Sequence, residues 1–395
     1  MKYLIPILVF YTCSACLIAQ RKMPVLHADS KKCYFLQGKT EFKSGWWLDV
    51  NTNPDIFVMD KARNAQKISF HTDTDELSIK LKPGQTFDFL VILNDKDSCY
   101  NRIDFPKQND IYSQLNPTQH DTIPFVLSPE NKIHLEVVLN EIDTLTVYFH
   151  TGSTGLELTH TAIKTRTSLL EALQADYQTS NFEFFPAINQ LQLGNLNWKN
   201  LSVMAIPIRA SGTDGSLGWN LFDGKVVEID YDKSLLIIHT QLPSVKGYSC
   251  LNLSFPNHNL AIQADLIFGN RKFSSPFLLN SGYQRALLLD SVIRFEQNFP
   301  SDLEILKSTS LVNGNGDVFN TLIVNTNEIQ LKNLKLTDVP AQLLDTDNPS
   351  GLKVHILGNE LLKRFNTIYD FQKNRVYIKP NSLKDLEYID GIPLE

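Results

Sequence analysis

The sequence lacks several patterns that would assign a function directly. Beyond the N-terminus no apolar run is long enough to cross a membrane as a helix. No basic stretch is dense enough to bind a nucleic acid or a membrane surface. There is no H-E-x-x-H metal spacing, no phosphate-binding loop and no dinucleotide-binding glycine pattern, so no metal or cofactor is expected. With 43% hydrophobic and 20% charged residues and a net charge of -6, the 395 residues predict an ordinary globular protein of two or three domains.

The N-terminus is predicted to be a signal peptide, residues 1–19. Lys2 supplies a positive charge, and the run from Leu4 to Ala19 is mostly apolar but short for a membrane span. A retained anchor and a lipoprotein cleavage before Cys16 are the alternatives. We therefore expect an exported protein, periplasmic, cell-surface or secreted, with no membrane span after cleavage.

Cysteine is scarce, with 5 residues in the chain. Cys13 and Cys16 form a C-x-x-C pattern, but they lie inside the signal segment, so a redox or metal role is a false positive. An exported location permits a disulfide between Cys33 and Cys99, which fall in one predicted domain. Two buried thiols are the equal alternative.

Residues 24–122 predict a small antiparallel β domain. Short β-prone runs are separated by turn signals such as Asn53-Pro54 and Lys82-Pro83-Gly84. The polar stretch 101–122 contains two prolines and is expected to be a linker. No cluster of His, Cys or carboxylates suggests chemistry in this domain.

Two similar stretches organise the remainder of the chain. Residues 147–158 and 276–290 each contain an apolar strand, one polar residue, Thr or Ser, a glycine and a second strand. The polar residue is His150 in the first stretch and Asn280 in the second. A glycine at such a tight turn puts one polar side chain at the tip of a loop, so we expect the two tips to face each other.

An internal repeat accompanies these stretches. After Gly218 and after Gly358 the same pattern follows in the same register, with Leu221 matching Leu361 and Ile238 matching Ile378. Residues 126–242 and 243–395 are therefore predicted to be two copies of one β unit, related by a pseudo-twofold axis. A helix is expected at 162–172.

These motifs resemble the pepsin-like and retropepsin-like aspartic peptidases. That family has Asp-Thr/Ser-Gly after an apolar strand in each lobe, and an apolar-apolar-Gly motif that passes the catalytic loop in a ψ-shaped crossing. Ile356-Leu357-Gly358 fits the second motif fully, and Ser216-Leu217-Gly218 fits it with Ser at the first place. The resemblance covers roughly residues 126–380. It implies a mainly β, bilobal aspartic-peptidase-like double β-barrel, here preceded by the small antiparallel β domain.

The sequence departs from the family at both catalytic positions. His-Thr-Gly and Asn-Ser-Gly replace the two Asp-Thr/Ser-Gly motifs. Two nearby aspartates share one proton and activate a water, whereas the carboxamide of Asn280 cannot ionise. No catalytic residue is therefore expected. The loop-supporting residues implied by the resemblance are retained at Thr151, Gly152, Ser281, Gly282, Gly218 and Gly358.

Three hypotheses follow. The first is a catalytically inactive pseudo-peptidase that binds a peptide or protein segment between its lobes. The second is an active peptidase or hydrolase built on His150, which would need a carboxylate within hydrogen-bond reach. The third is a scaffold whose N-terminal domain performs recognition. Of the nearby carboxylates, Asp214 is expected to make a structural hydrogen bond, and Glu157 and Asp290 are expected to be solvent-facing or capping residues.

Overall fold

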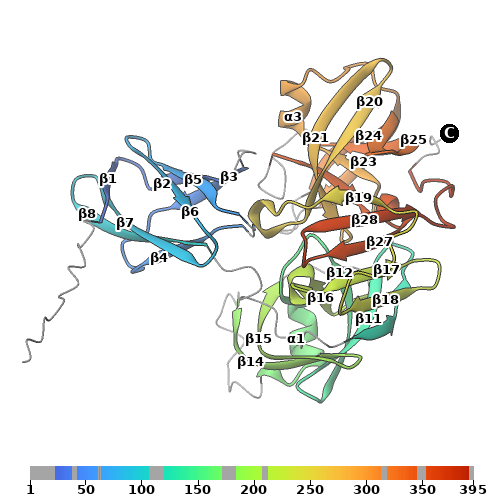
Figure 1. Ribbon diagram of the computed structural model, residues 1–395, viewed down its shortest axis with the longest axis horizontal. Coiled ribbons are helices and arrows are strands. Elements are labelled where there is room, and N and C mark those ends of the chain that lie inside the picture. Colours follow the sequence, from blue (N-terminus) through green and yellow to red (C-terminus); the bar gives the residue numbers. More distant parts are fainter. Residues whose placement is uncertain are drawn as a thin grey trace, which may run out of the picture.

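The computed structural model describes residues 23–37, 42–60, 62, 64–105, 120–170, 184–206, 212–312, 318–344 and 353–390. The predicted signal peptide lies outside these ranges. A small β domain lies to one side of a larger body made of two stacked lobes (Figure 1). No helix in the described part of the chain is both long and apolar enough to span a bilayer.

The N-terminal domain consists of two four-stranded sheets packed around an aromatic core that includes Phe35, Phe70 and Phe89. Its strands are β1 (Val25–Ala28), β2 (Lys32–Gln37), β3 (Phe42–Trp47), β4 (Asp55–Val58), β5 (Gln66–His71), β6 (Glu76–Leu81), β7 (Gln85–Leu93) and β8 (Asp97–Phe105). Most neighbours are antiparallel, but β1 pairs with β7 and β4 with β8 in parallel. β8 extends through 101–105, which the polarity of that stretch had assigned to the linker.

Of the two alternatives for Cys33 and Cys99, a disulfide or two buried thiols, the structure shows the second. Both are free, buried thiols. They belong to different sheets, Cys33 on β2 and Cys99 on β8, and both pack into the core of the N-terminal domain. Burial raises the pKa of the Cys33 thiol to about 11, with Asp73 adding to the shift, so the thiol is protonated and behaves as a small apolar side chain.

Each lobe of the body is a closed barrel of six strands. In the first, the order β11-β12-β16-β13-β15-β14 is closed by pairing of β11 with β14, and β10 adds an outer strand. Its elements are β10 (Val126–Leu127), β11 (Ile133–Leu139), β12 (Asp143–His150), β13 (Leu156–Thr159), α1 (His160–Arg166), β14 (Phe184–Leu193), β15 (Leu196–Ile206), β16 (Gly215–Gly218) and η1 (Trp219–Phe222).

The second lobe repeats the six barrel strands in the same order, but its outer strand pairs with β24, whereas β10 of the first lobe pairs with β11. Its order β20-β21-β26-β22-β25-β24 is closed by β20 and β24, with β23 as the outer strand. Its elements are η2 (Pro256–His258), β20 (Ala261–Phe268), β21 (Arg271–Asn280), β22 (Leu287–Leu289), α3 (Ser291–Glu296), β23 (Ile305–Val312), β24 (Val318–Leu331), β25 (Leu334–Leu343), β26 (His355–Gly358) and α4 (Asn359–Leu362). The mainly β, bilobal double-barrel prediction is confirmed.

The predicted helix at 162–172 is found in part: residues 162–166 belong to α1, Leu169 and Leu170 are helical again after a break at Thr167 and Ser168, and residues 171–172 lie outside the described ranges. α1 begins at His160, where the Thr159 side chain caps it by accepting from the Ala162 N–H, and it ends at Arg166. The pattern of three leucines that suggested a longer helix follows α1; of these, Leu169 is buried in the barrel core.

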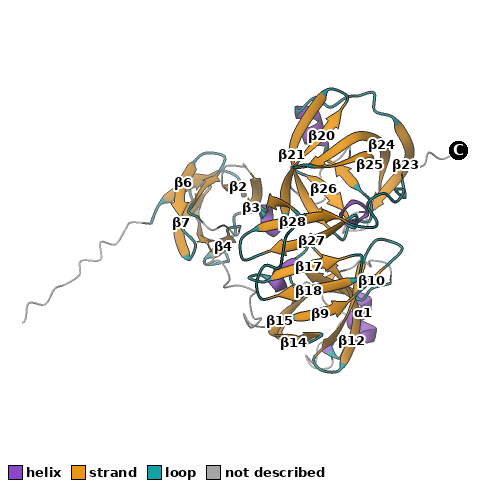
Figure 2. Cartoon of the chain, turned by 45° about the vertical axis from the view of Figure 1, so that its right-hand side comes forward, coloured by secondary structure: helices purple, strands orange, loops and turns teal. Residues whose placement is uncertain are grey.

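A six-stranded sheet joins the lobes, and Figure 2 shows it between the two barrels. Its order is β19-β28-β27-β17-β18-β9, from β9 (Asp121–Pro124), β17 (Val226–Asp230), β18 (Leu235–His239), β19 (Ser249–Asn252), β27 (Phe365–Asp370) and β28 (Arg375–Pro380). At its centre Glu228 lies opposite Ile368, its own counterpart in the repeat. The pseudo-twofold axis therefore passes between these two residues.

The N-terminal domain contacts the second lobe at the η2 turn, through β3 and through the Asp60 carboxylate. Asp60 accepts hydrogen bonds from the backbone N–H groups of Asn257 and His258 at 3.0 and 2.9 Å. Both donors have positive φ, which turns their N–H groups toward the same acceptor. The Trp219 indole of the first lobe donates to the His258 carbonyl at 2.8 Å, so the η2 turn contacts all three units.

Candidate functional site

Four hydrogen bonds hold the two loop tips together across the lobe boundary. The Thr151 hydroxyl donates to the Leu279 carbonyl at 2.7 Å and accepts from the Ser281 N–H at 2.9 Å. In mirrored fashion the Ser281 hydroxyl donates to the Phe149 carbonyl at 2.7 Å and accepts from the Thr151 N–H at 3.0 Å. Thr151 and Ser281 are both buried. The reciprocal bonds fix the separation of the residues that precede them, His150 and Asn280.

His150 and Asn280 are in direct contact, with Nε2 of the imidazole 3.0 Å from Oδ1 of the carboxamide. The N–H groups of Gly282 and Tyr283 point at the same Oδ1, at 2.9 and 3.1 Å. Two backbone donors require an acceptor there, so this atom is the oxygen and not the amide nitrogen. The imidazole must then carry its proton on Nε2 and donate it to Asn280.

The other imidazole nitrogen is an acceptor. Nδ1 of His150 lies 3.4 Å from the Tyr148 hydroxyl, which is therefore the donor. Burial lowers the pKa of His150 to about 4, against the opposing influence of Glu157. At neutral pH the pair is consequently uncharged, whereas two aspartates at these positions would share one negative charge.

Four glycines leave room for this arrangement. A Cβ on Gly152 would lie 2.7 Å from Asn280 Cγ, and one on Gly282 would lie 2.3 Å from His150 Nε2. Each loop glycine thus accommodates the side chain of the opposite lobe. Gly218 and Gly358 end the ψ-crossing strands, where an added Cβ would meet backbone atoms at 2.4 and 2.1 Å. The crossings themselves are present, since β16 lies parallel to β12 and antiparallel to β13, and β26 lies likewise between β21 and β22.

Sequence reasoning missed Glu157, which is not a solvent-facing residue. The carboxylate is half-buried and accepts hydrogen bonds from the Ser153 hydroxyl and, at 2.5 Å, from the Ser216 hydroxyl. Ser216 also lies beside the Tyr148 hydroxyl, so a row of polar side chains, here called the polar chain, extends from Glu157 to His150. The signal in the sequence was the Ser at the first place of Ser216-Leu217-Gly218, where the motif has an apolar residue.

This polar chain exists in one lobe only. By strand register Tyr148, Ser216 and Glu157 correspond to Leu278, Ile356 and Leu288 of the second lobe. Those three side chains form an apolar cluster with their neighbours. The repeat therefore acts as an internal comparison: the barrel is stable with apolar residues at these positions, and the first lobe has polar ones beside His150.

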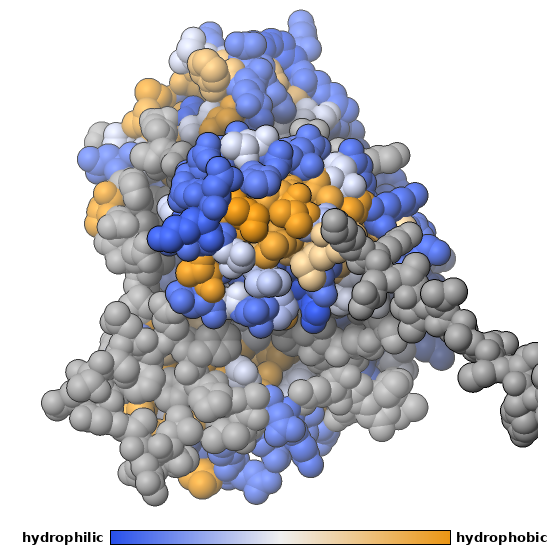
Figure 3. Space-filling model, turned by 90° about the vertical axis from the view of Figure 1, so that its left-hand side faces the viewer, coloured by the Kyte–Doolittle hydropathy of each residue, from blue (hydrophilic) through white to orange (hydrophobic). Residues whose placement is uncertain are grey.

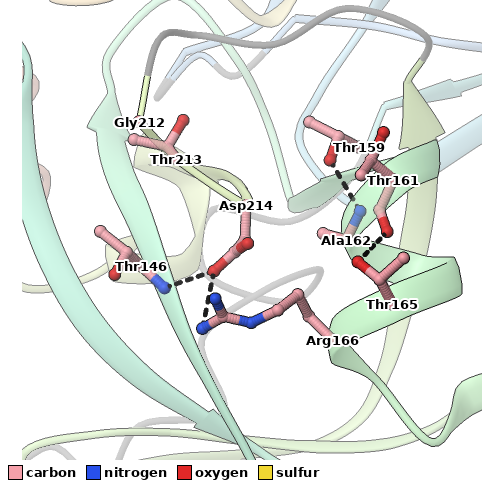
Figure 4. A pocket seen from close by; sticks show the side chains of 9 residues that line it. All are labelled: Thr146, Thr159, Thr161, Ala162, Thr165, Arg166, Gly212, Thr213 and Asp214. Atoms are coloured by element: carbon pink, nitrogen blue, oxygen red, sulfur yellow. Dashed lines mark hydrogen bonds and ion pairs between the residues drawn. The ribbon is translucent and has the colours of Figure 1, made fainter.

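Asp214 makes the structural hydrogen bond expected of it. Its Oδ2 accepts from the Thr146 N–H at 2.9 Å and lies 3.7 Å from the Arg166 guanidinium. These residues line a threonine-rich pocket of about 320 Å³ beside α1, in which the Asp214 carboxylate points at Arg166 (Figure 4).

Asp290 is buried and caps α3 by accepting from the Ile293 N–H at 2.9 Å, as the capping alternative predicted.

The geometry does not supply the partner that a His150-based hydrolase would need. Within the described ranges no carboxylate hydrogen-bonds His150, whose two ring nitrogens face Asn280 and Tyr148. The described residues also contain no cluster of three His, Cys, Asp or Glu side chains able to hold a metal ion.

Sequence comparisons give no assignment: no family model matches the chain, and no curated protein matches it. Among solved structures it is similar to an aspartic proteinase from Irpex lacteus, with a TM-score of 0.44 and 11% identity over 68% of this chain and 99% of that chain.

Proposed function

We propose that this chain is an exported, non-cleaving protein of the bilobal aspartic-peptidase-like fold, which binds an extended peptide or protein segment between its lobes. The observation that supports it best is the neutral His150–Asn280 pair. Both side chains are half-buried at the junction of the lobes, at the two positions where the resemblance to aspartic peptidases implies a carboxylate pair. The pair holds no negative charge with which to activate a water.

The retained scaffold supports binding rather than loss of all function. The reciprocal Thr151–Ser281 bonds and the loop glycines keep the two tips at contact distance although neither tip has an acid. A segment lying between two β lobes is able to add to their exposed strand edges through main-chain hydrogen bonds.

A peptidase assay tests the absence of cleavage. The purified mature chain is incubated with a mixture of unstructured peptides between pH 3 and pH 8, and the products are examined by mass spectrometry. No cleavage above a buffer control is expected. Cleavage that disappears in His150→Ala would overturn the proposal in favour of the hydrolase alternative.

N-terminal sequencing of the mature protein tests the proposed export and cleavage near Ala19.

Restoring the acids tests whether the groove still binds substrates. The double variant His150→Asp, Asn280→Asp is expected to cleave peptides weakly at acid pH, because the supporting bonds are in place. His150→Asn, Asn280→Asp, which supplies one acid only, is the matched control and should stay inactive. A folded double variant without activity would indicate that the groove no longer accepts a peptide.

A second candidate is recognition by the N-terminal domain. One face of this domain shows a patch of apolar side chains in Figure 3. Exposed Val25, Ile56 and Tyr100 lie on the sheet β1-β7-β8-β4, where Val25 is opposite Leu90 and Leu90 is opposite Tyr100. A contiguous apolar patch on a soluble domain is typical of an interaction surface. Loss of peptide binding on removal of this domain from the full chain would favour this candidate.

A further inference from the structure

Lys132 lies beside the His150–Asn280 pair. β11 and β12 pair with His134 opposite Tyr148, and the same register, extended by two residues, puts Lys132 opposite His150. The Lys132 ammonium is 5.0 Å from the centre of the Tyr148 ring, whose hydroxyl is the partner of His150 Nδ1. The residue as a whole is only 7% exposed.

The backbone at this position is fixed by both lobes. Within its own turn Lys132 accepts from the Ser128 N–H at 2.9 Å and donates to the Ser128 hydroxyl at 3.2 Å. The preceding residue, Asn131, binds the second lobe: its carbonyl accepts from the Asn359 amide and its own amide donates to Glu360, both at 2.6 Å. Lys132 is therefore held at the lobe junction with little freedom of its backbone.

The ammonium of Lys132 makes no ion pair within the described part of the chain, although the charge of Glu130, two residues away, favours its protonated form. Among the described residues no carboxylate lies within ion-pair distance of its Nζ, whereas the comparably buried Lys363 and Lys307 pair with Glu360 and Asp390, each at 2.7 Å. Burial lowers the pKa of Lys132 to about 8, so the side chain is still mostly charged at pH 7. A largely buried cation without a counter-ion is costly to the fold, and such a cost points to an anion supplied from outside.

The neighbouring His150–Asn280 pair also offers hydrogen-bond donor groups to a ligand. Both ring nitrogens of His150 and the oxygen of Asn280 are used within the protein, but within the described residues no acceptor lies against the Asn280 Nδ2. Asn280 and Lys132 lie on the Nε2 and Nδ1 sides of the imidazole, respectively. The junction thus offers N–H groups and a positive charge, which is the reverse of an acidic catalytic site.

We propose that Lys132 anchors a carboxylate of the bound segment, either an acidic side chain or a C-terminal carboxylate. This inference rests on the proposed function, because it defines the chemistry of the ligand at the same junction. The second lobe has no equivalent cation: by register the counterpart of Lys132 is Asn259, whose amide donates to the Asn257 carbonyl of its own turn at 2.9 Å. The anchor is therefore one-sided and orients the segment with its carboxylate toward the first lobe.

Three pools of fluorescein-labelled octapeptides test the proposal. The first has an internal Asp or Glu and an amidated C-terminus, the second has a free C-terminal carboxylate and no acidic side chain, and the third is neutral and amidated. Binding to the mature chain is measured by fluorescence anisotropy at pH 7. At least one carboxylate pool should bind about tenfold tighter than the neutral pool, and the pool that does so identifies the source of the carboxylate.

Variants at Lys132 separate the charge from the packing. Lys132→Met should bring the preferred pool to the affinity of the neutral pool and leave the neutral pool unchanged, while Lys132→Arg should retain the preference. Lys272→Met, at a lysine whose side chain is 56% exposed in the second lobe, is the matched control and should change nothing.

Failure of the Lys132 anchor and failure of the proposed peptide binding give different results in this experiment. Equal affinity for all three pools, or a preference that survives Lys132→Met, would overturn the anchor and leave peptide binding intact. Binding of no pool would overturn the proposed function together with the anchor.

Discussion

At the scale of single residues, the lobe junction has an uncharged pair of side chains held in place by buried hydroxyls. Thr151 and Ser281 make reciprocal hydrogen bonds, and between them Nε2 of His150 lies 3.0 Å from Oδ1 of Asn280. Histidine and asparagine satisfy each other as donor and acceptor, so the loops need no shared proton to remain in contact.

The cross-lobe hydroxyls should contribute strongly to stability. Thr151→Val keeps the shape of a fully buried side chain but removes a donor and an acceptor, leaving the Ser281 N–H and Leu279 carbonyl unpaired. We expect the free energy of unfolding to fall by about 2–4 kcal/mol, measured by urea denaturation. Thr165→Val, at an exposed hydroxyl on α1, is the matched control. Equal effects of the two substitutions would contradict this account.

The protonation of His150 should make stability depend on pH. The folded-state pKa is lowered to about 4 from an ordinary 6.5, so the unfolded chain binds the proton more readily between these values. The stabilising effect of the neutral imidazole is therefore complete above about pH 6.5 and is lost as the pH falls toward 4. His150→Gln should show a shallower decline in unfolding free energy over this window, by about 1–3 kcal/mol. An unchanged slope would count against the depressed pKa.

At the scale of elements, the ψ-crossings decide where the loop tips lie. β16 and β26 each pass between two strands of their own barrel, and the glycines at their ends allow backbone contacts that a side chain would block. The same crossings place Ser216 in the first lobe and Ile356 in the second behind the tips. The difference between the lobes therefore comes from side chains on identical elements.

The crossing glycine of the second lobe should not tolerate a side chain. In Gly358→Ala the new Cβ would lie 2.1 Å from the Arg285 carbonyl oxygen, which is backbone and unable to move away cheaply. We expect a loss of about 3 kcal/mol or more, or failure to fold. In the control Gly45→Ala the new Cβ would meet nothing within 4 Å. Circular dichroism and thermal melting of both variants would check this, and a normal melting temperature for Gly358→Ala would refute it.

At the scale of the molecule, the two lobes form one structural unit and the N-terminal domain another. A single apolar cluster runs from Ile123 to Ile378 through both barrels, and a separate cluster fills the N-terminal domain. The shared sheet and the cross-lobe bonds join the barrels, whereas the N-terminal domain contacts the η2 turn through β3 and the Asp60 carboxylate.

Calorimetry should therefore show two unfolding transitions, one for residues 23–105 and one for residues 120–390. Residues of a continuous core unfold together, because partial unfolding would expose its apolar surface to water. Hydrogen exchange read by mass spectrometry would assign each transition to its segment. Separate unfolding of the two lobes would show that the shared sheet does not couple them.

The sequence by itself determined the mainly β class, the duplication and the identity of the side chains at the two loop tips. Strand alternation, the repeat after Gly218 and Gly358, and the pair of loop motifs are local patterns, and local patterns are readable along the chain. The parallel pairings of the N-terminal domain, the start of α1 at His160 and the free state of Cys33 and Cys99 were not readable. These depend on which strands lie side by side.

Only the tertiary structure decided what surrounds His150. Glu157, Ser216 and Lys132 come from separate strands or turns, and no local sequence pattern shows that the three meet near His150. Barrel closure and the lobe contact bring them to one side of the imidazole. Burial there sets the protonation of His150, and no carboxylate of the described residues forms an ion pair with Lys132. The charge state and the hydrogen-bond partners of a side chain depend on which groups lie near it in space. The fold therefore decides them, and the order of residues along the chain does not.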